Sequence, residues 1–454
     1  MYHQKKFFVL VLLAGLFFVG CSKDKDSDKS IKGIDIEKIM KLPYSELDSD
    51  EQKAKLEQEC LDLLELCNAA KTSSAFETIR NFGNLLNEGQ PELVIARAAK
   101  KVTDVFEFAS VYGVYTWNAS EKDWDFTEST TELKFVFPAT QKAKTNNAIL
   151  SVQSVKSDVS VTIYEYEDWD EDEEEDVEYE GILWLPKSVT STLTVDNKEV
   201  AGIEVSAEYK NNKPIPVKHE FTFTTSDGYT YWYKIEKGNV NQVSMKMSYQ
   251  NKAMFEVVFK SGIKLDEIFD GLINDEFDEP PYDLMDEVNA YVKLMDNLVL
   301  VYQVDLEKFV KKMNQIEDEY YDALDALDSD WNTNKDRYTT VDRIEKAYSD
   351  KSAKAFNDYM KVALCSTKEN YKIADLFVVS EAYDEYWDYY YWNDEQNEWE
   401  WDWNRPEVKL YNYYKSNPYL KFNDDTIVEA SVYFSDGFDD LMEKLTEFFD
   451  EFNE

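Results

Sequence analysis

The chain of 454 residues contains only two histidines, His3 and His219, and this scarcity limits the chemistry that it can carry. Zinc sites built from several histidines are excluded, and a Ser-His-Asp or Cys-His site would have to use one of these two residues. His219 alternates with Val217, Phe221 and Phe223, so we expect it on the apolar face of a strand. A partly buried histidine with satisfied hydrogen bonds is the favoured interpretation, and a catalytic base is the alternative.

Glycine is scarce as well, and its 13 residues are scattered, which argues against a glycine-rich phosphate loop. The sequence also has no HExxH and no CxxC motif. Carboxylate pairs are too common in so acidic a chain to indicate a glycosidase. The acidic run 167–178 favours a mobile loop, with a divalent-cation site as the weaker alternative. We therefore predict no catalytic residues, no metal site and no cofactor.

Basic residues are few, with 49 Lys and Arg against 92 Asp and Glu, and the formal net charge is −43. Nucleic-acid binding is excluded, because it needs clustered cations that displace counterions from phosphates. Electrostatic docking on an anionic membrane is excluded for the same reason. The chain is nevertheless 43% hydrophobic and 15% aromatic, so the acidity does not indicate a disordered protein.

Cysteine is limited to Cys21, Cys60, Cys67 and Cys365. Cys60 and Cys67 follow a helical pattern seven positions apart, roughly 10 Å along the axis. Since a disulfide needs Cα atoms within about 7 Å, these two cannot pair with each other on one helix. We expect Cys60, Cys67 and Cys365 to be small apolar core residues, and pairing of Cys365 with one of the other two stays open.

The first 20 residues have the layout of a secretory signal. Lys5 and Lys6 precede an apolar stretch from Phe7 to Val19, which is shorter than the about 20 residues of a membrane-spanning helix. The stretch ends in Phe18-Val19-Gly20-Cys21, which resembles the lipobox of bacterial lipoproteins. The acid-containing segment after Cys21 resembles the export signal of surface lipoproteins of Bacteroidota.

This resemblance implies that residues 1–20 are removed and that Cys21 carries the lipid anchor as the new N-terminus. It implies an outer-membrane lipoprotein of a Gram-negative bacterium, facing the cell surface or the periplasm. The membrane would then be a partner through Cys21, with an unidentified protein or glycan as the second partner. Loss of Lys5 and Lys6 with the leader changes the formal charge from −43 to −45.

The rest of the chain predicts an α+β fold in which helical regions alternate with antiparallel, curved β-meander sheets before a C-terminal helix. Residues 21–45 are expected to be a flexible tether, 46–262 helices followed by an antiparallel sheet, and 263–454 helices followed by an aromatic-rich antiparallel sheet and the C-terminal helix. Period-two alternation separated by turn residues predicts the first sheet, with one apolar and one polar face. The apolar spacing through 284–320 predicts long amphipathic helices, and Phe438 to Phe449 predicts the terminal helix.

A weak internal repeat relates the two halves. The segment from Tyr115 to Phe126 aligns without gaps to the segment from Tyr390 to Trp401, 275 positions later, and each copy predicts a hairpin flanked by tryptophans. Duplication of a unit of helices and sheet is one interpretation, and two unrelated aromatic hairpins are the other.

Tryptophans are concentrated between residues 387 and 403, and the five in this segment are the candidate ligand-binding residues. They are Trp387, Trp392, Trp399, Trp401 and Trp403. On a strand the last three would share one face, and flat rings beside carboxylates suit sugar binding. The favoured alternative is that these rings fill the interior under covering helices.

Taken together, the sequence predicts a lipid-anchored cell-envelope protein with a non-catalytic binding or structural role. A surface glycan-binding lipoprotein using the hairpin 387–403 is one alternative. A carrier that holds an apolar ligand on the 190–260 sheet is the other.

Overall fold

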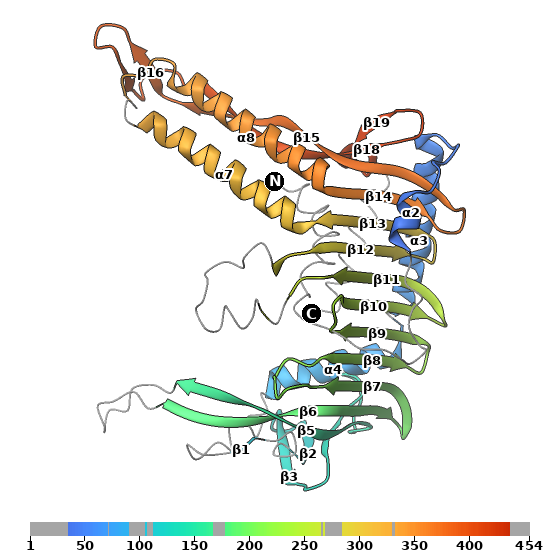
Figure 1. The fold of residues 1–454 in the computed structure, drawn as a ribbon. Helices are drawn as coiled ribbons and strands as arrows, with labels where there is room; N and C mark the ends of the chain where they lie inside the picture. Colours follow the sequence, from blue (N-terminus) through green and yellow to red (C-terminus); the bar gives the residue numbers. More distant parts are fainter. Residues whose placement is uncertain are drawn as a thin grey trace, which may run out of the picture.

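The computed structural model describes residues 35–70, 72–89, 105–106, 112–166, 178–264, 267, 284–328 and 332–435. These residues form one large, almost entirely antiparallel sheet with helices packed against it, so the predicted α+β fold class is confirmed (Figure 1). The acidic run 167–177 and the stretch Phe438 to Phe449, where a terminal helix is predicted, lie outside the described residues. The last described element is the short helix α9 (Ala430–Tyr433).

Within the described residues the sheet contains 17 strands, and most neighbouring strands are consecutive in the chain. From one end to the other they are β3 (Asp123–Glu128), β2 (Gly113–Asn118), β4 (Leu133–Phe137), β5 (Ala148–Tyr166), β6 (Glu178–Val195), β7 (Lys198–Glu208), β8 (Lys218–Thr225), β9 (Tyr229–Glu236), β10 (Asn241–Tyr249), β11 (Lys252–Ser261), β12 (Glu287–Leu294), β13 (Leu298–Asp305), β14 (Met360–Ser366), β15 (Tyr371–Asp388), β18 (Val408–Lys421) and β19 (Ile427–Glu429), with β1 (Val105–Phe106) beside β6. Among the described strands, only the pairs β1–β6 and β2–β4 run parallel.

The meander predicted for 190–260 is confirmed, and its turns lie where Asn, Asp and Gly occur. Asp196 and Asn197 both have positive φ between β6 and β7, as do Gln250 and Asn251 between β10 and β11. Two-residue hairpin turns need this backbone conformation, which Asn and Asp adopt more readily than most residues. Across the boundary predicted at 262/263, β11 pairs with β12, so a single sheet spans both halves of the chain.

The helices predicted to begin at residue 284 are wrong up to residue 305, because this segment forms β12 and β13. Both faces of these strands are covered: Leu298 packs in one cluster and its neighbour Val299 in another on the opposite face. In β13 the apolar residues on both faces erase the period-two signal, and across the two strands they produce chance spacings of three and four. The helix begins only at Leu306, in α7 (Leu306–Asp328), and α8 (Arg337–Tyr359) follows.

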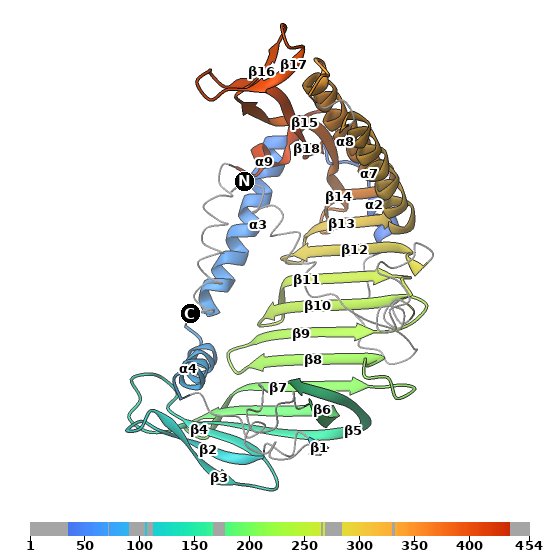
Figure 2. The same cartoon turned by 90° about the vertical axis from the view of Figure 1, so that its left-hand side faces the viewer.

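The tether predicted for residues 21–45 is shorter than expected at its C-terminal end. Asp35 caps α2 (Ile36–Met40), whose Ile36 and Ile39 are buried against one face of β11–β14. Tyr44 then forms a bridge with Lys372 of β15, and α3 (Ser49–Ala70) continues along the opposite face. Figure 2 shows α3 lying alongside the stack of strands.

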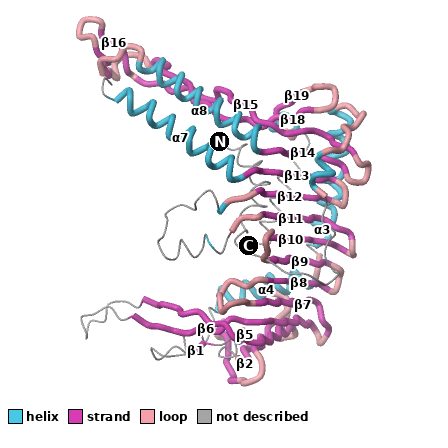
Figure 3. The backbone as a smooth tube through the Cα atoms, viewed as in Figure 1, coloured by secondary structure: helices cyan, strands magenta, loops and turns pink. Residues whose placement is uncertain are grey.

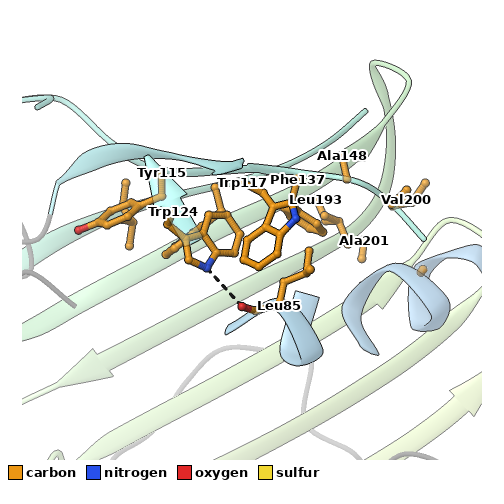
Figure 4. Close-up of a cluster of buried hydrophobic side chains, with 13 residues drawn as sticks. Leu85, Tyr115, Trp117, Trp124, Phe137, Ala148, Leu193, Val200 and Ala201 are labelled. Carbon is orange, nitrogen blue, oxygen red and sulfur yellow. Dashed lines mark hydrogen bonds between the residues drawn. The ribbon is translucent and has the colours of Figure 1, made fainter. Parts of the chain in front are cut away.

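The remaining helices cover the two ends of the sheet. α4 (Ser74–Gly89) packs on β2–β7, where Leu85 accepts a hydrogen bond from the indole N–H of Trp124 at 3.4 Å (Figure 4). At the other end, α7 and α8 extend with the long strands β15 and β18 as an arm that ends in the small hairpin of β16 (Tyr390–Asn393) and β17 (Glu398–Trp401) (Figures 1 and 3). This arm carries the predicted tryptophan site.

Gly89 at the end of α4 allows the helix to approach the buried pair Trp117 and Trp124. A Cβ at this position would lie 2.8 Å from the Trp117 ring and 2.9 Å from the Trp124 ring. We therefore expect Gly89→Ala to lower the free energy of unfolding by about 1–3 kcal/mol through overpacking.

Gly83 on the same helix is the matched control, because nothing lies within 4 Å of its added Cβ. Gly83→Ala should instead stabilise the protein by roughly 0.5–1 kcal/mol through helix propensity. Urea unfolding of both variants measures the contrast. Equal effects at the two positions would contradict close packing of the helix end on the rings.

Candidate functional site

The five candidate tryptophans all lie on the arm, but the structure divides them into two groups. Trp392 and Trp399 are half-buried cross-strand partners of the hairpin, with ring centroids 5.7 Å apart. Trp387, Trp401 and Trp403 are 49%, 53% and 68% exposed. The interpretation that all these rings fill the interior is therefore wrong for three of the five.

The predicted shared face of Trp399, Trp401 and Trp403 holds only in part. Trp399 and Trp401 both belong to β17, but Trp403 follows the end of that strand. Trp399 packs edge-on against Tyr338 of α8, with centroids 4.8 Å apart, and its indole N–H donates to the Asn334 carbonyl at 2.8 Å. This ring attaches the hairpin to the helix, so it is unavailable as a stacking surface.

Support for the hairpin comes from residues at the start of α8 that the sequence analysis did not single out. Arg337 is 2% exposed, and its guanidinium lies 4.3 Å from the Tyr338 ring centroid and 5.5 Å from that of Tyr390. Such cation–π contacts gain strength when the cation is desolvated. No sequence motif marks Arg337, since its role depends on a hairpin more than 50 residues later.

Two of the three exposed rings have their indole N–H groups bonded to carboxylates of the same arm. Trp401 donates to Asp388 Oδ1 at 3.0 Å, and Trp387 donates to Glu385 Oε2 at 3.0 Å. Glu385 also accepts a hydrogen bond from Lys409 at 2.6 Å. This bond, and to a lesser extent the bond from Trp387, holds the pKa of Glu385 below its ordinary value. We name the set of Trp387, Trp401 and Trp403 the aromatic tip.

Carboxylates near the aromatic tip remain ionised for identifiable reasons. Desolvation alone would raise the pKa of Asp388, but hydrogen bonds from the Tyr389 backbone, the Tyr386 hydroxyl and the Trp401 indole hold it below the ordinary value. The pKa of Asp402 is lowered by the backbone and side chain of Asn404. The tip is therefore aromatic and anionic at neutral pH.

The first hairpin, β2–β3, has the same cross-strand pairing as β16–β17, at the spacing of 275 residues found in the sequence. Trp117 faces Trp124 with centroids 5.3 Å apart, as Trp392 faces Trp399. Trp117 and Trp124 are 6% and 7% exposed, because α4 covers them. The same motif thus forms core at one end of the molecule and supports an exposed tip at the other.

The turns of the two hairpins are equivalent in detail as well. Asn118 Oδ1 accepts the backbone N–H groups of the residues two and three positions later, and so does Asn393 Oδ1. Each Asn also donates from Nδ2 to the acid seven positions later, Asp125 or Glu400. Duplication of a larger unit stays a prediction.

The apolar face of the predicted carrier sheet is covered at one end of its strands. Tyr229 and Met254 are buried with Cys67 of α3, and Phe223 packs in the cluster under α4. Phe221 and Tyr233 are half-buried and belong to none of the buried clusters among the described residues. Binding of an apolar ligand here stays a prediction.

The three cysteines of the described chain are free, as expected for core residues. Cys365 lies with α2 on one face of the sheet, whereas Cys60 and Cys67 belong to α3 on the other. Burial raises the pKa of Cys67 to about 11 and those of Cys60 and Cys365 to about 12. These thiols are protonated at neutral pH and lack the character of nucleophiles.

Among the described residues, no group of three or more His, Cys, Asp or Glu side chains is arranged to hold a metal ion. None of the helices in that part of the chain is both long and apolar enough to cross a membrane. No protein family matches the chain, and neither the curated proteins nor the solved structures include a similar one.

His219 is partly buried in a stack of rings, as predicted, but its hydrogen bonds are not satisfied. Its ring lies 5.3 Å from that of Tyr233 at an interplanar angle of 21°, and Tyr233 in turn stacks on Phe221. Nδ1 is buried without a hydrogen-bond partner. Burial lowers the pKa of His219 below its ordinary value, since it disfavours the charged ring.

This depressed pKa predicts a loss of stability in mild acid. Below pH 6.5 the unfolded chain binds a proton at His219 more readily than the folded chain, so stability falls with pH until the folded-state pKa is passed. His219→Phe keeps the stack and removes this dependence. The urea midpoint between pH 7 and pH 5 should decrease less in the variant than in the wild type; parallel pH profiles would refute the assignment.

Proposed function

We propose that this chain is a lipid-anchored, non-catalytic binding protein of the Gram-negative cell envelope, and that the aromatic tip is its binding surface. The proposal rests on one observation above all: Trp387, Trp401 and Trp403 of the arm are 49%, 53% and 68% exposed. A tryptophan face that is open to solvent offers a flat apolar area on which a partner can stack. Tryptophan is also enriched among residues that dominate binding energies.

A glycan is the ligand class that this surface favours. Rigid indole faces offer flat apolar area at low entropic cost, and they can stack on the C–H faces of sugar rings. The anionic body of the protein disfavours polyanions such as nucleic acid. A protein partner would use the same exposed rings, so a glycan panel separates the two ligand classes.

The anchor is tested at Cys21, which lies outside the described residues. Expressed in a Bacteroidota host, the wild type should incorporate labelled palmitate and partition into the detergent phase of Triton X-114. Cys21→Ser should do neither, because the thiol that carries the lipid is absent. Cys60→Ser is the matched control and should remain lipidated; detergent partition of Cys21→Ser equal to that of wild type would contradict the anchor.

The tip is tested with the soluble chain from residue 22 onward and a panel of polysaccharides in affinity electrophoresis. Trp401→Ala and Trp403→Ala should each weaken retention by a binding glycan about three- to tenfold, which corresponds to roughly 0.5–1.5 kcal/mol for one aromatic contact. Trp403→Ala should change the free energy of unfolding by less than about 0.5 kcal/mol, because its ring is exposed, whereas Trp401→Ala should lower it by about 0.5–1.5 kcal/mol through the lost bond to Asp388.

Phe126→Ala is the matched control, since Phe126 occupies the position of Trp401 in the first hairpin and is 39% exposed. It should bind as wild type does. Retention that is unaffected by both tip substitutions, or lost equally in Phe126→Ala, would place the binding surface elsewhere. If no polysaccharide retains the protein, the glycan is excluded and a protein partner is the ligand class that the proposal keeps.

A further inference from the structure

The carboxylates around the aromatic tip are occupied by contacts within the arm. Asp388 Oδ1 accepts from the Trp401 indole and from the Tyr389 backbone, while Oδ2 accepts from the Tyr386 hydroxyl at 2.8 Å. Glu385 is shared between the Trp387 indole and Lys409. These two acids therefore bind indole N–H groups of the same arm.

Glu400, which lies between Trp399 and Trp401 in the sequence, is engaged in the same way. It accepts from the Tyr391 hydroxyl and from Asn393 Nδ2, the latter at 2.7 Å. On this face of the hairpin the Arg405 guanidinium lies 3.3 Å from the Tyr391 ring centroid. The contacts of these side chains therefore hold the hairpin together, while the rings of the aromatic tip stay the most exposed tryptophans among the described residues.

From these contacts we propose that Asp388 and Glu385 are positioning residues that fix the Trp401 and Trp387 rings, and that the tip recognises an uncharged polysaccharide through ring stacking. This inference rests on the proposed binding function and specifies its ligand class and its supporting residues. A ring whose N–H is already bonded is held near one orientation, so less conformational freedom is lost when a ligand stacks on it.

The charge balance of the arm supports an uncharged ligand. A polyanion would approach ionised Asp388, Glu385 and Asp402, with unfavourable electrostatic energy. A polycation is attracted by the net charge, but at Asp388 it would compete with the indole, hydroxyl and backbone donors already bonded there. An uncharged chain of sugars avoids the repulsion and needs no free carboxylate.

The ligand class is tested with three soluble polymers: an unsubstituted glucan, an anionic polyuronate and a cationic polyglucosamine. The wild type should bind the glucan most tightly, and its affinity should change by less than twofold between 50 mM and 500 mM NaCl, since stacking is not screened by salt. Tighter binding of either charged polymer, or a steep loss of glucan affinity with salt, would overturn the inference while leaving the tip as a binding surface. Binding of none of the three would overturn the glycan assignment itself.

The positioning role is tested at Asp388 with two variants. Asp388→Ala removes the acceptor for the Trp401 indole and should weaken glucan binding about two- to tenfold. Asp388→Asn removes the charge but retains an oxygen that can accept from the indole, so its affinity should stay within about twofold of wild type. Equal losses in both variants would show that the charge itself is required and would overturn the role.

Two further measurements separate positioning from general damage to the hairpin. Asp402→Asn removes an acid adjacent to Trp401 that bonds Asn404 and no indole, and it should bind normally. In a Trp401→Ala background, Asp388→Ala should cause no further loss, because the ring that it positions is absent. Additive losses in this cycle would assign Asp388 a structural role.

The anchoring is also observable without any ligand. With 5-fluorotryptophan incorporated, the ¹⁹F resonance that disappears in Trp401→Phe belongs to Trp401. Asp388→Ala should shift this resonance toward the position of a solvent-averaged ring, whereas Asp388→Asn should leave it near the wild-type position. An unchanged resonance in Asp388→Ala would overturn the positioning role, whatever the polymers show.

Discussion

A single sheet of this length has two faces to cover, and the segment from α2 to α3 covers both of them in the middle of the molecule. Ile36 and Ile39 bury one face of the central strands, the chain passes the sheet at Tyr44, and Leu56 and Leu64 bury the other. Because these apolar contacts lie on opposite sides of β13, the strand is buried as in a sheet covered by helices on both faces. The arm beyond β14 continues from this two-sided core.

Whether one or both faces of a strand are buried explains which parts of the fold could be predicted from the sequence. In β7–β10 one face is polar, so apolar residues alternate and the meander is readable from Ile203 to Tyr249. In β13 both faces are apolar, from Leu298 to Val301, and the preceding turn has Met295 and Asp296 at positive φ. Period two is absent in β13, and chance spacings of three and four through 284–302 predict a helix where the chain forms strands.

The candidate site was predictable in its residues but not in its geometry. The concentration of tryptophans in 387–403 is visible in the sequence. Which of these rings are buried and which are exposed is not. That division depends on Tyr338 and Asn334, which lie more than 50 positions earlier and hold only Trp399. The comparison of the two hairpins makes the same point, since equal turns and equal ring pairs differ in exposure according to whether a helix such as α4 lies over them.

The acidic residues at the aromatic tip make different contacts from the acidic residues elsewhere on the surface. Most acids form a solvated surface, and exposed ion pairs among them, such as Lys346 with Asp350, contribute little to stability. Asp388 and Glu385 are instead joined to indole N–H groups that would otherwise bond to water or to a ligand. Because each of these bonds satisfies a polar edge and leaves an apolar face exposed, the acids make the tryptophans more uniformly apolar toward solvent. An anionic protein can in this way present a surface whose recognition depends on shape and ring stacking more than on charge.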